Sequence, residues 1–212
     1  MFRIRIQNKK KCIWYCSAVV SFLLFLLLLG WTNHLANTQD AQQMAGRWSE
    51  KKDVAQISCF FSSKAEVTED TIQSFEYSLK NVLQEASITE TSENPSARLW
   101  VDAYSADGKI TLVNGKNTLD ANAIGIGGDF FMFHPLKLIT GAYFSGNDLM
   151  QDYCIIDQDA AWQLFGSNDV VGMTVYIGNV PHIVTGVVQR PDSRMDKAAG
   201  LNSTVVFVSY ET

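Results

Sequence analysis

The chain has 212 residues, of which 47% are hydrophobic, enough to build the packed core of one or two small domains. Its net charge is −5, yet the first 31 residues hold five bases and no acid, so 12 of the 17 bases share the remaining chain with all 22 acids. This acidic remainder argues against nucleic acid as a partner, because neutralising phosphates takes clustered Lys and Arg, and we interpret it as a solvated surface.

Residues 13–31 predict a membrane-spanning helix. They read IWYCSAVVSFLLFLLLLGW without one charge, and about 20 apolar residues cross a hydrocarbon core about 30 Å thick. The positive-inside rule places the N-terminus in the cytoplasm because bases precede this stretch, namely Arg3, Arg5, Lys9, Lys10 and Lys11. We therefore expect residues 1–11 in the cytoplasm, residues 12–31 in the membrane and residues 32–212 outside the cytoplasm.

A cleaved signal peptide is the alternative, since it also joins a basic region to an apolar one. Cleavage after the apolar run would put a large polar residue at the −3 position, where a small one is needed: His34, Gln39 or Gln42. The apolar run is also long for a signal peptide. These two features favour an uncleaved membrane anchor.

The segment after the anchor predicts a helical stalk, a strand and a helix in that order. Residues 32–52 are rich in Ala and Gln and continue the membrane helix as a stalk, with Gly46 as an interruption. Residues 53–61, DVAQISCFF, predict a first strand. Residues 68–86 predict an amphipathic helix, capped by Thr68 or Asp70, whose apolar residues recur at helical spacing and face a sheet: Ile72, Phe75, Leu79, Val82 and Leu83.

The middle of the chain predicts mostly strands. Residues 88–97 are a loop, and residues 97–107 and 107–113 read as a hairpin that turns at Asp107–Gly108. The stretch 123–135, AIGIGGDFFMFHP, predicts a strand that runs into a short helical turn.

The last third predicts a strand at 153–156, a short helix, a hairpin and a final strand. Asp157 or Asp159 caps the helix and Gly166 ends it. The hairpin is VGMTVYI, the turn GNVP and HIVTGVV, within residues 171–188, and STVVFVSY forms the last strand. We expect an α+β fold: an α/β part over about 53–125, a β-rich part over about 126–190 and a return strand over about 203–212.

No motif in the chain predicts catalysis. There is no G-x-S-x-G, no H-E-x-x-H and no P-loop. GIGGDF at 125–130 lacks the spacing and the Lys of a phosphate loop, so we interpret it as a tight strand-to-helix turn. Asp157 and Asp159 could be paired acids, but helix capping accounts for them. We therefore assign no catalytic, cofactor-binding or metal-binding residue, and expect neither a cofactor nor enzymatic activity.

The four cysteines do not form a disulfide framework or a metal-binding pattern. Cys12 and Cys16 lie one turn apart in the membrane segment, where helix packing or palmitoylation would use them. Cys59 and Cys154 lie in apolar runs, and the sequence leaves open whether they are buried free thiols or a disulfide formed outside the cytoplasm.

The order of spaced residues from Gly128 to Val188 resembles the extracytoplasmic core domain of MacB/FtsX-type ABC transporter permeases. A first set fits the segment "G..FF......L..G..F": Gly128, Phe130, Phe131, Leu138, Gly141 and Phe144. A second set fits "A..LFG..D.VG..V.I": Ala161, Leu164, Phe165, Gly166, Asp169, Val171, Gly172, Val175 and Ile177. The hairpin ends as the family's does, with Val184, Gly186, Val187 and Val188.

The resemblance implies a non-enzymatic role: relaying ATPase-driven movement to export or to partners outside the cytoplasm. It implies a cytoplasmic ABC ATPase subunit, a second permease copy or paralogue, and the lipid bilayer as partners. A peptide, lipoprotein or protein outside the cytoplasm would be the further partner. The mixed sheet with packed helices that the family shares would form a rigid module.

Such permeases carry three further membrane helices after this domain, but no second apolar run of that length follows residue 31 here. We therefore expect a fragment of a longer permease or a truncated relative. The alternative function is a membrane-anchored extracellular binding module for a peptide or a lipid. In either case the loops 88–97 and 190–203 are candidate recognition segments, because loops carry recognition.

Overall fold

The structure is a computed structural model, and it describes residues 2–38, 44–48, 54–88, 98–145, 148, 150–190, 197–198 and 203–212. The chain divides into two compact units, Met1–Gln56 and Ile57–Thr212. The first contains the predicted anchor and the second contains the sheet.

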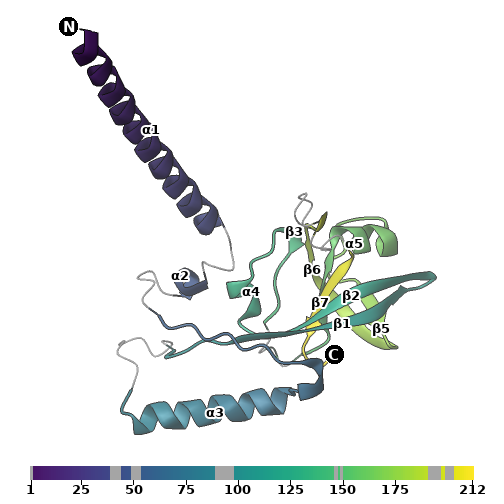
Figure 1. The fold of residues 1–212 in the computed structure, drawn as a ribbon. Coiled ribbons are helices and arrows are strands. Elements are labelled where there is room, and N and C mark those ends of the chain that lie inside the picture. The colour runs from purple at the N-terminus through teal and green to yellow at the C-terminus, as the bar shows by residue number, and fades with distance from the viewer. Residues whose placement is uncertain are drawn as a thin grey trace. The chain divides into compact units, whose positions relative to one another are not determined.

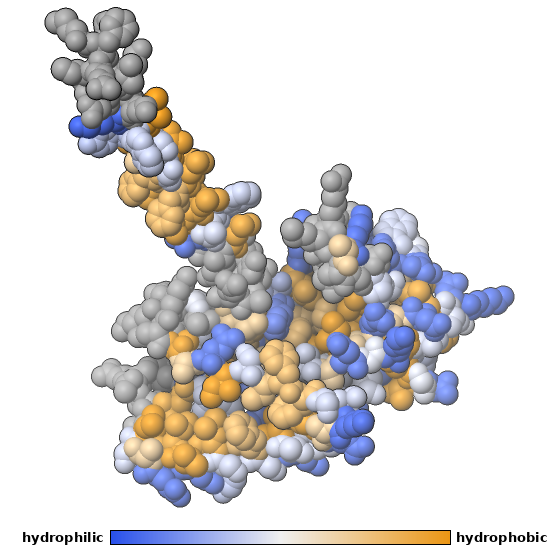
Figure 2. All heavy atoms as spheres, viewed as in Figure 1, coloured by the Kyte–Doolittle hydropathy of each residue, from blue (hydrophilic) through white to orange (hydrophobic). Residues whose placement is uncertain are grey.

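Unit 1 is dominated by α1, an unbroken helix over Phe2–Thr38 (Figure 1). Its stretch Ile13–Leu35 has a mean hydropathy of 2.3, no part of it is buried, and it is long and apolar enough to cross a membrane. Figure 2 shows the apolar side chains of this stretch along the helix. The short helix α2, Met44–Trp48, follows and contains Gly46. Of the predicted stalk, residues 39–43 and 49–52 lie outside the described residues.

Unit 2 is built on a seven-stranded mixed sheet in the order β3-β6-β4-β7-β2-β1-β5. β5 also pairs with β6, so six of the strands close into a ring of pairings. The β2–β7 and β4–β6 pairs are parallel and the other pairs are antiparallel. The strands are β1 Ala103–Asn114, β2 Asn117–Gly128, β3 Leu138–Gly141, β4 Tyr153–Asp157, β5 Thr174–Ile177, β6 Val180–Val188 and β7 Val205–Ser209.

The helices α3, α4 and α5 accompany the sheet in the described part of the chain, and the predicted α+β class is confirmed. α3 spans Glu69–Glu85 and is capped by Thr68, whose side chain accepts a hydrogen bond from the Thr71 amide, as predicted. α4 is the single turn Phe130–Phe133, and α5 spans Gln158–Phe165 and ends at Gly166 with φ 75°. A 3₁₀ turn, η2, covers Ser63–Ala65.

Two apolar clusters form the core of unit 2. The first joins α5 to the sheet and includes Ala160, Leu164 and Val184, each at most 1% exposed. The second gathers aromatic rings around α4, where Phe131 stacks on Tyr143 with ring centroids 4.5 Å apart. The apolar residues predicted on the inner faces of the short helix and of the β5–β6 hairpin thus meet in one place.

The hairpin predicted to turn at Asp107–Gly108 is wrong, because β1 runs straight through these residues. They pair with Ile124 and Ala123 of β2. The chain turns instead after Asn114, where Gly115 adopts φ 59°. An Asp-Gly pair makes a tight turn only where the backbone takes up positive φ, and a twelve-residue ladder with β2 outweighs that local preference here.

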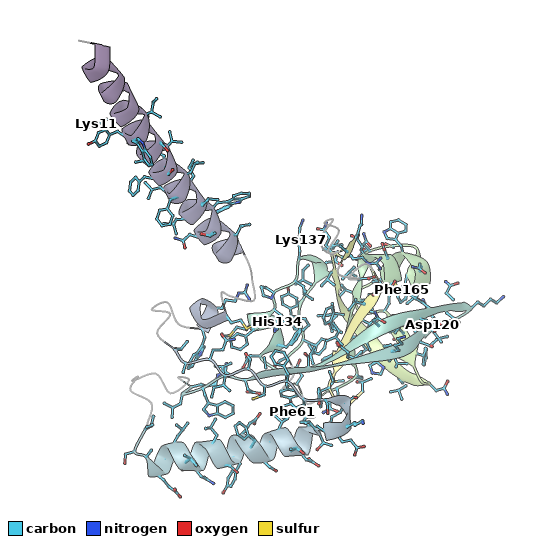
Figure 3. All side chains as sticks on the ribbon, in the orientation of Figure 1. Lys11, Phe61, Asp120, His134, Lys137 and Phe165 are labelled. Carbon is cyan, nitrogen blue, oxygen red and sulfur yellow. The ribbon has the colours of Figure 1, made fainter. Side chains whose placement is uncertain are left out.

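The strand predicted at 53–61 is also wrong over its described part. Residues 54–62 have no regular secondary structure and pair with no strand in the described part of the chain. The side chains of Ile57, Phe60 and Phe61 are 88%, 96% and 68% exposed, and Phe61 is labelled in Figure 3. A β-type sequence becomes a strand only when a neighbouring strand satisfies its backbone groups.

The buried carboxylate of Asp157 joins four elements of unit 2. Its Oδ1 accepts the Ala160 amide at 2.7 Å and so caps α5, which confirms the capping prediction. Its Oδ2 accepts Nε and Nη2 of Arg190 at 3.1 and 2.8 Å and the Val205 amide at 3.0 Å. Arg190 follows β6 and Val205 begins β7, so one charge ties the ends of β4, β6 and β7 to α5.

Replacing Asp157 with Asn should destabilise unit 2 by about 3 kcal/mol, because Arg190 would stay half-buried without its carboxylate while the amide oxygen could still cap α5. Asp159→Asn is the matched control: Asp159 also pairs with Arg190, at 2.7 Å, but it is 45% exposed and should cost less than about 1 kcal/mol. Urea unfolding of the full chain in detergent, followed by tryptophan fluorescence, measures both. Equal losses of stability in the two variants would contradict a larger contribution from the buried Asp157–Arg190 ion pair.

Gly141 should be irreplaceable at the end of β3. It has φ 84°, and a Cβ there would collide with the Thr185 carbonyl and lie 2.7 Å from the Gly186 Cα. Gly141→Ala should therefore cost about 3 kcal/mol. The control Gly178→Ala shares the positive φ, at 55°, but meets open space and should cost about 1 kcal/mol in the same assay. A Gly141 variant as stable as the Gly178 variant would contradict the close packing of β3 on β6.

Candidate functional site

The paired acids considered in the sequence analysis have structural roles, and so do two histidines. Asp157 and Asp159 bind Arg190, and His182 is 2% exposed with Nδ1 3.1 Å from the Val180 carbonyl oxygen. The His134 ring lies 4.7 Å from that of Phe130. Among the described residues no group of three or more His, Cys, Asp or Glu side chains could hold a metal ion. The candidate recognition loops fall mostly outside the described residues, at 89–97, 191–196 and 199–202.

The glycine-rich string at 125–130 is filled by protein side chains. A Cβ on Gly127 would collide with the Tyr104 ring, and one on Gly128, at φ 60°, would lie 2.8 Å from Oδ2 of Asp102. β2 ends at Gly128 and α4 begins at Phe130, which confirms the predicted strand-to-helix turn. The glycines therefore make room for Tyr104 and Asp102 rather than for a phosphate.

Cys59 and Cys154 are both free thiols. Cys154 is fully buried in β4, and burial raises the pKa of its thiol to about 12, so it is unreactive at neutral pH. Cys59 is exposed, so the expectation of a buried thiol holds for Cys154 and is wrong for Cys59.

A group of titratable side chains lies where the first half of α3 meets the sheet. Tyr104 of β1 donates its hydroxyl to Oε1 of Glu69 at 3.3 Å, and Tyr210 after β7 donates to the Val67 carbonyl at 2.9 Å. The two tyrosine rings meet edge to face with centroids 5.1 Å apart. We call this contact the acidic seam, and its members are Glu69, Glu76, Asp102, Tyr104, Tyr210 and Glu211.

Carboxylates in the acidic seam oppose one another. Burial, and then the charge and the hydrogen-bonding carboxyl of Asp102, raise the pKa of Glu76 to about 6. Burial and the neighbouring carboxyl of Glu211 raise the pKa of Glu69, against hydrogen bonds from Tyr104 and Gln73 that lower it. Burial and the charges of Glu69, Asp102 and Glu76 raise the pKa of Tyr104.

Sequence reasoning missed the acidic seam because its members come from distant parts of the chain. Tyr104 lies 35 residues from Glu69, and Tyr210 lies 143 residues from Val67. The local signal was the acidic inner edge of the amphipathic helix, where Glu69 and Glu76 lie beside the apolar residues Ile72 and Leu79. A charged residue on the sheet-facing side of an amphipathic helix is the sequence pattern that could have indicated this seam.

Arg98 pairs with an acid beside the seam. Nη1 of Arg98 contacts Oδ2 of Asp129 at 2.6 Å, and this ion pair raises the pKa of Arg98 with a smaller contribution from the charge of Asp102. The hydrogen bonds of Tyr104 and Tyr210 hold the start of α3 on the sheet.

The family model described as the MacB-like periplasmic core domain matches residues 20–212. The macrolide export ATP-binding/permease protein MacB of Chromobacterium violaceum is 33% identical over 96 residues, which are 44% of this chain and 14% of that protein. Its counterpart from Pasteurella multocida is 30% identical over 97 residues, 45% of this chain and 14% of that protein. The matched segment is thus a small part of the length of these relatives.

Two solved structures resemble parts of the chain. One is the periplasmic region of MacB from Actinobacillus actinomycetemcomitans, at 25% identity and TM-score 0.42 over 55% of this chain and 52% of that one. The other is the extracellular domain of the noncanonic ABC-type transporter YknZ from Gram-positive bacteria, at 22% identity and TM-score 0.42 over 51% and 54%. Because the family model covers nearly the whole chain, the chain belongs to the MacB-like periplasmic core domain family.

Proposed function

We propose that the chain is the extracytoplasmic domain, with its membrane anchor, of an ABC transporter permease subunit that relays ATPase-driven movement to partners outside the cytoplasm. One observation carries the proposal: the family match begins inside the apolar helix α1, at residue 20, and continues through the whole sheet. Anchor and domain therefore belong to one family unit.

A relay needs a part that moves as a rigid body, and unit 2 has the properties of one. Its core residues are fully buried, and the Asp157 carboxylate fastens four elements together. In this proposal the energy for movement comes from a cytoplasmic ABC ATPase subunit. The helix α1 continues to Thr38, beyond the predicted end of the membrane segment at residue 31, which supports a helical connection from the bilayer outward.

The proposal assigns residues 1–11 to the cytoplasm, 12–31 to the membrane, 32–52 to a stalk and 53–212 to the extracytoplasmic domain. The bases before the apolar stretch support this orientation. A second permease copy or paralogue would complete the transporter, and a peptide, lipoprotein or protein outside the cytoplasm would receive the movement. Identifying that partner would also identify the class of substrate.

Affinity purification of the tagged full-length protein in mild detergent from its own cells tests the ATPase partnership. We expect an ABC ATPase subunit to co-purify, identified by mass spectrometry, with ATP hydrolysis well above that of an unrelated tagged single-pass membrane protein purified in parallel. A monomer that binds a peptide or lipid and brings no ATPase would contradict the relay and support the binding module.

Thiol labelling in intact cells tests the orientation. In a variant whose Cys12 and Cys16 are replaced by Ser, a membrane-impermeant maleimide should label the exposed Cys59 and leave the buried Cys154 unlabelled. The matched control adds Asn8→Cys and Cys59→Ser, and should label only after lysis. Labelling of residue 8 in intact cells would reverse the proposed orientation.

A further inference from the structure

α3 carries an apolar stripe that unit 2 covers only in part. We call it the α3 stripe, and its members are Ile72, Phe75, Leu79, Val82 and Leu83. None of them is buried: Ile72, Leu79 and Leu83 are half-buried. Phe75 and Val82, which were predicted to face the sheet, are 65% and 59% exposed. One edge of the stripe is therefore open to solvent along the helix.

The exposed apolar surface in this part of the chain is larger than α3 alone provides. Phe60 and Phe61, in the segment before η2, are 96% and 68% exposed. At roughly 200 Å² for one phenylalanine side chain, these two and Phe75 leave about 450 Å² of aromatic surface in water. Figure 2 shows hydrophobic side chains gathered over α3 and over the segment that precedes it. Because monomeric proteins rarely expose more than a few hundred Å² of contiguous apolar surface, this surface indicates an interaction site.

The spacing of the α3 stripe fits a second helix. Its members from Ile72 to Val82 recur at intervals of three and four residues, which is the pattern by which two helices pack along a shared seam. At 1.5 Å per residue the stripe is about 15 Å long, enough for about three turns of a partner helix. Such a helix would lie along α3 and cover Phe75 and Val82 with its own apolar side chains.

The charges of α3 indicate which kind of helix would bind. Its charged residues are four acids and one base: Glu69, Asp70, Glu76, Glu85 and Lys80. None of the five forms an ion pair within the described part of the chain. Asp102 and Glu211 of the acidic seam add negative charge beside the helix. Since complementary charge selects partners and like charge rejects them, Lys or Arg should flank the apolar side chains of the partner helix.

The same charges disfavour two other occupants of the α3 stripe. If a second copy of this chain laid its own α3 on this one, the acids of both helices would come together and repel. A bilayer surface is disfavoured as well, because helices that lie on membranes carry Lys and Arg on their polar face, whereas α3 carries mostly acids.

We propose that the α3 stripe is the docking surface for a basic amphipathic helix of another protein. This proposal rests on the proposed function for the location of the surface outside the cytoplasm, and it deepens that function by naming the chemistry of a partner that would receive the movement. The test below uses the chain without an ATPase, so docking can fail while the ATPase partnership holds, and the reverse.

Binding of synthetic peptides to the full chain in phosphatidylcholine nanodiscs tests the proposal. The probe is a helical peptide of three heptads with Leu at the a and d positions and Lys at the e and g positions. The comparison peptide has Glu in place of every Lys. Fluorescence anisotropy of the labelled peptides gives the dissociation constants, and nanodiscs without protein give the lipid background. We expect the basic peptide to bind about tenfold more tightly than the acidic one, with an affinity that falls as salt is added.

Two substitutions on opposite sides of α3 locate the docking surface. Phe75→Ser should weaken binding of the basic peptide about tenfold, because an aromatic side chain at the centre of an interface supplies much of its binding energy. Tyr77→Ser is the matched control. Tyr77 is similarly exposed, at 69%, but it lies about 200° around the helix from Phe75 and should leave the affinity unchanged.

Three results would overturn the proposal. The first is equal binding of the basic and the acidic peptide, or binding no tighter than to nanodiscs without protein. The second is an equal effect of the two substitutions. The third is a wild-type chain that sediments in detergent as a dimer and becomes a monomer on Phe75→Ser, because a second copy would then occupy the α3 stripe.

Discussion

The buried carboxylate of Asp157 is the constraint on which the rest of unit 2 depends. A carboxylate taken out of water costs several kcal/mol unless it is paired and fully hydrogen-bonded. Here Oδ1 takes the Ala160 amide and Oδ2 takes Arg190 and the Val205 amide. All these partners reach the carboxylate only if β4 lies between β6 and β7 and α5 begins at the end of β4. The charge therefore favours this strand order over alternatives that leave it unpaired.

Sequence predicted the features that depend on near neighbours along the chain. The Thr68 and Asp157 caps act on amides three residues away, and Gly166 supplies the positive φ that ends α5. The β5–β6 hairpin needed only its alternating pattern and a turn. The partners of Asp157 could not be foreseen in the same way, because Arg190 and Val205 lie 33 and 48 residues further on and meet the carboxylate only after the sheet forms.

The two wrong strand predictions have one cause, which is that a strand is defined by its neighbour. At Asp107–Gly108 the local turn preference gave way to β2, which offers an uninterrupted partner from Asn117 to Gly128. At residues 54–62 the reverse holds, because strand-forming residues find no ladder in the described chain. The acidic seam was missed for the same reason: no local pattern shows which acids from distant segments will face one another.

Unit 2 thus combines a rigid sheet with the loosely held helix α3, and the order of these elements along the chain matters for a relay of movement. The sheet is fastened by buried side chains and by Asp157, whereas α3 has no buried residue and meets the sheet through opposed acids. α3 also comes between the anchor helix and the first strand along the chain, so any tension passed through the backbone from α1 reaches α3 before the sheet. A helix without a buried side chain yields before the packed core does. A proposed relay of movement would therefore act first on the docking of α3, with the sheet responding as a whole.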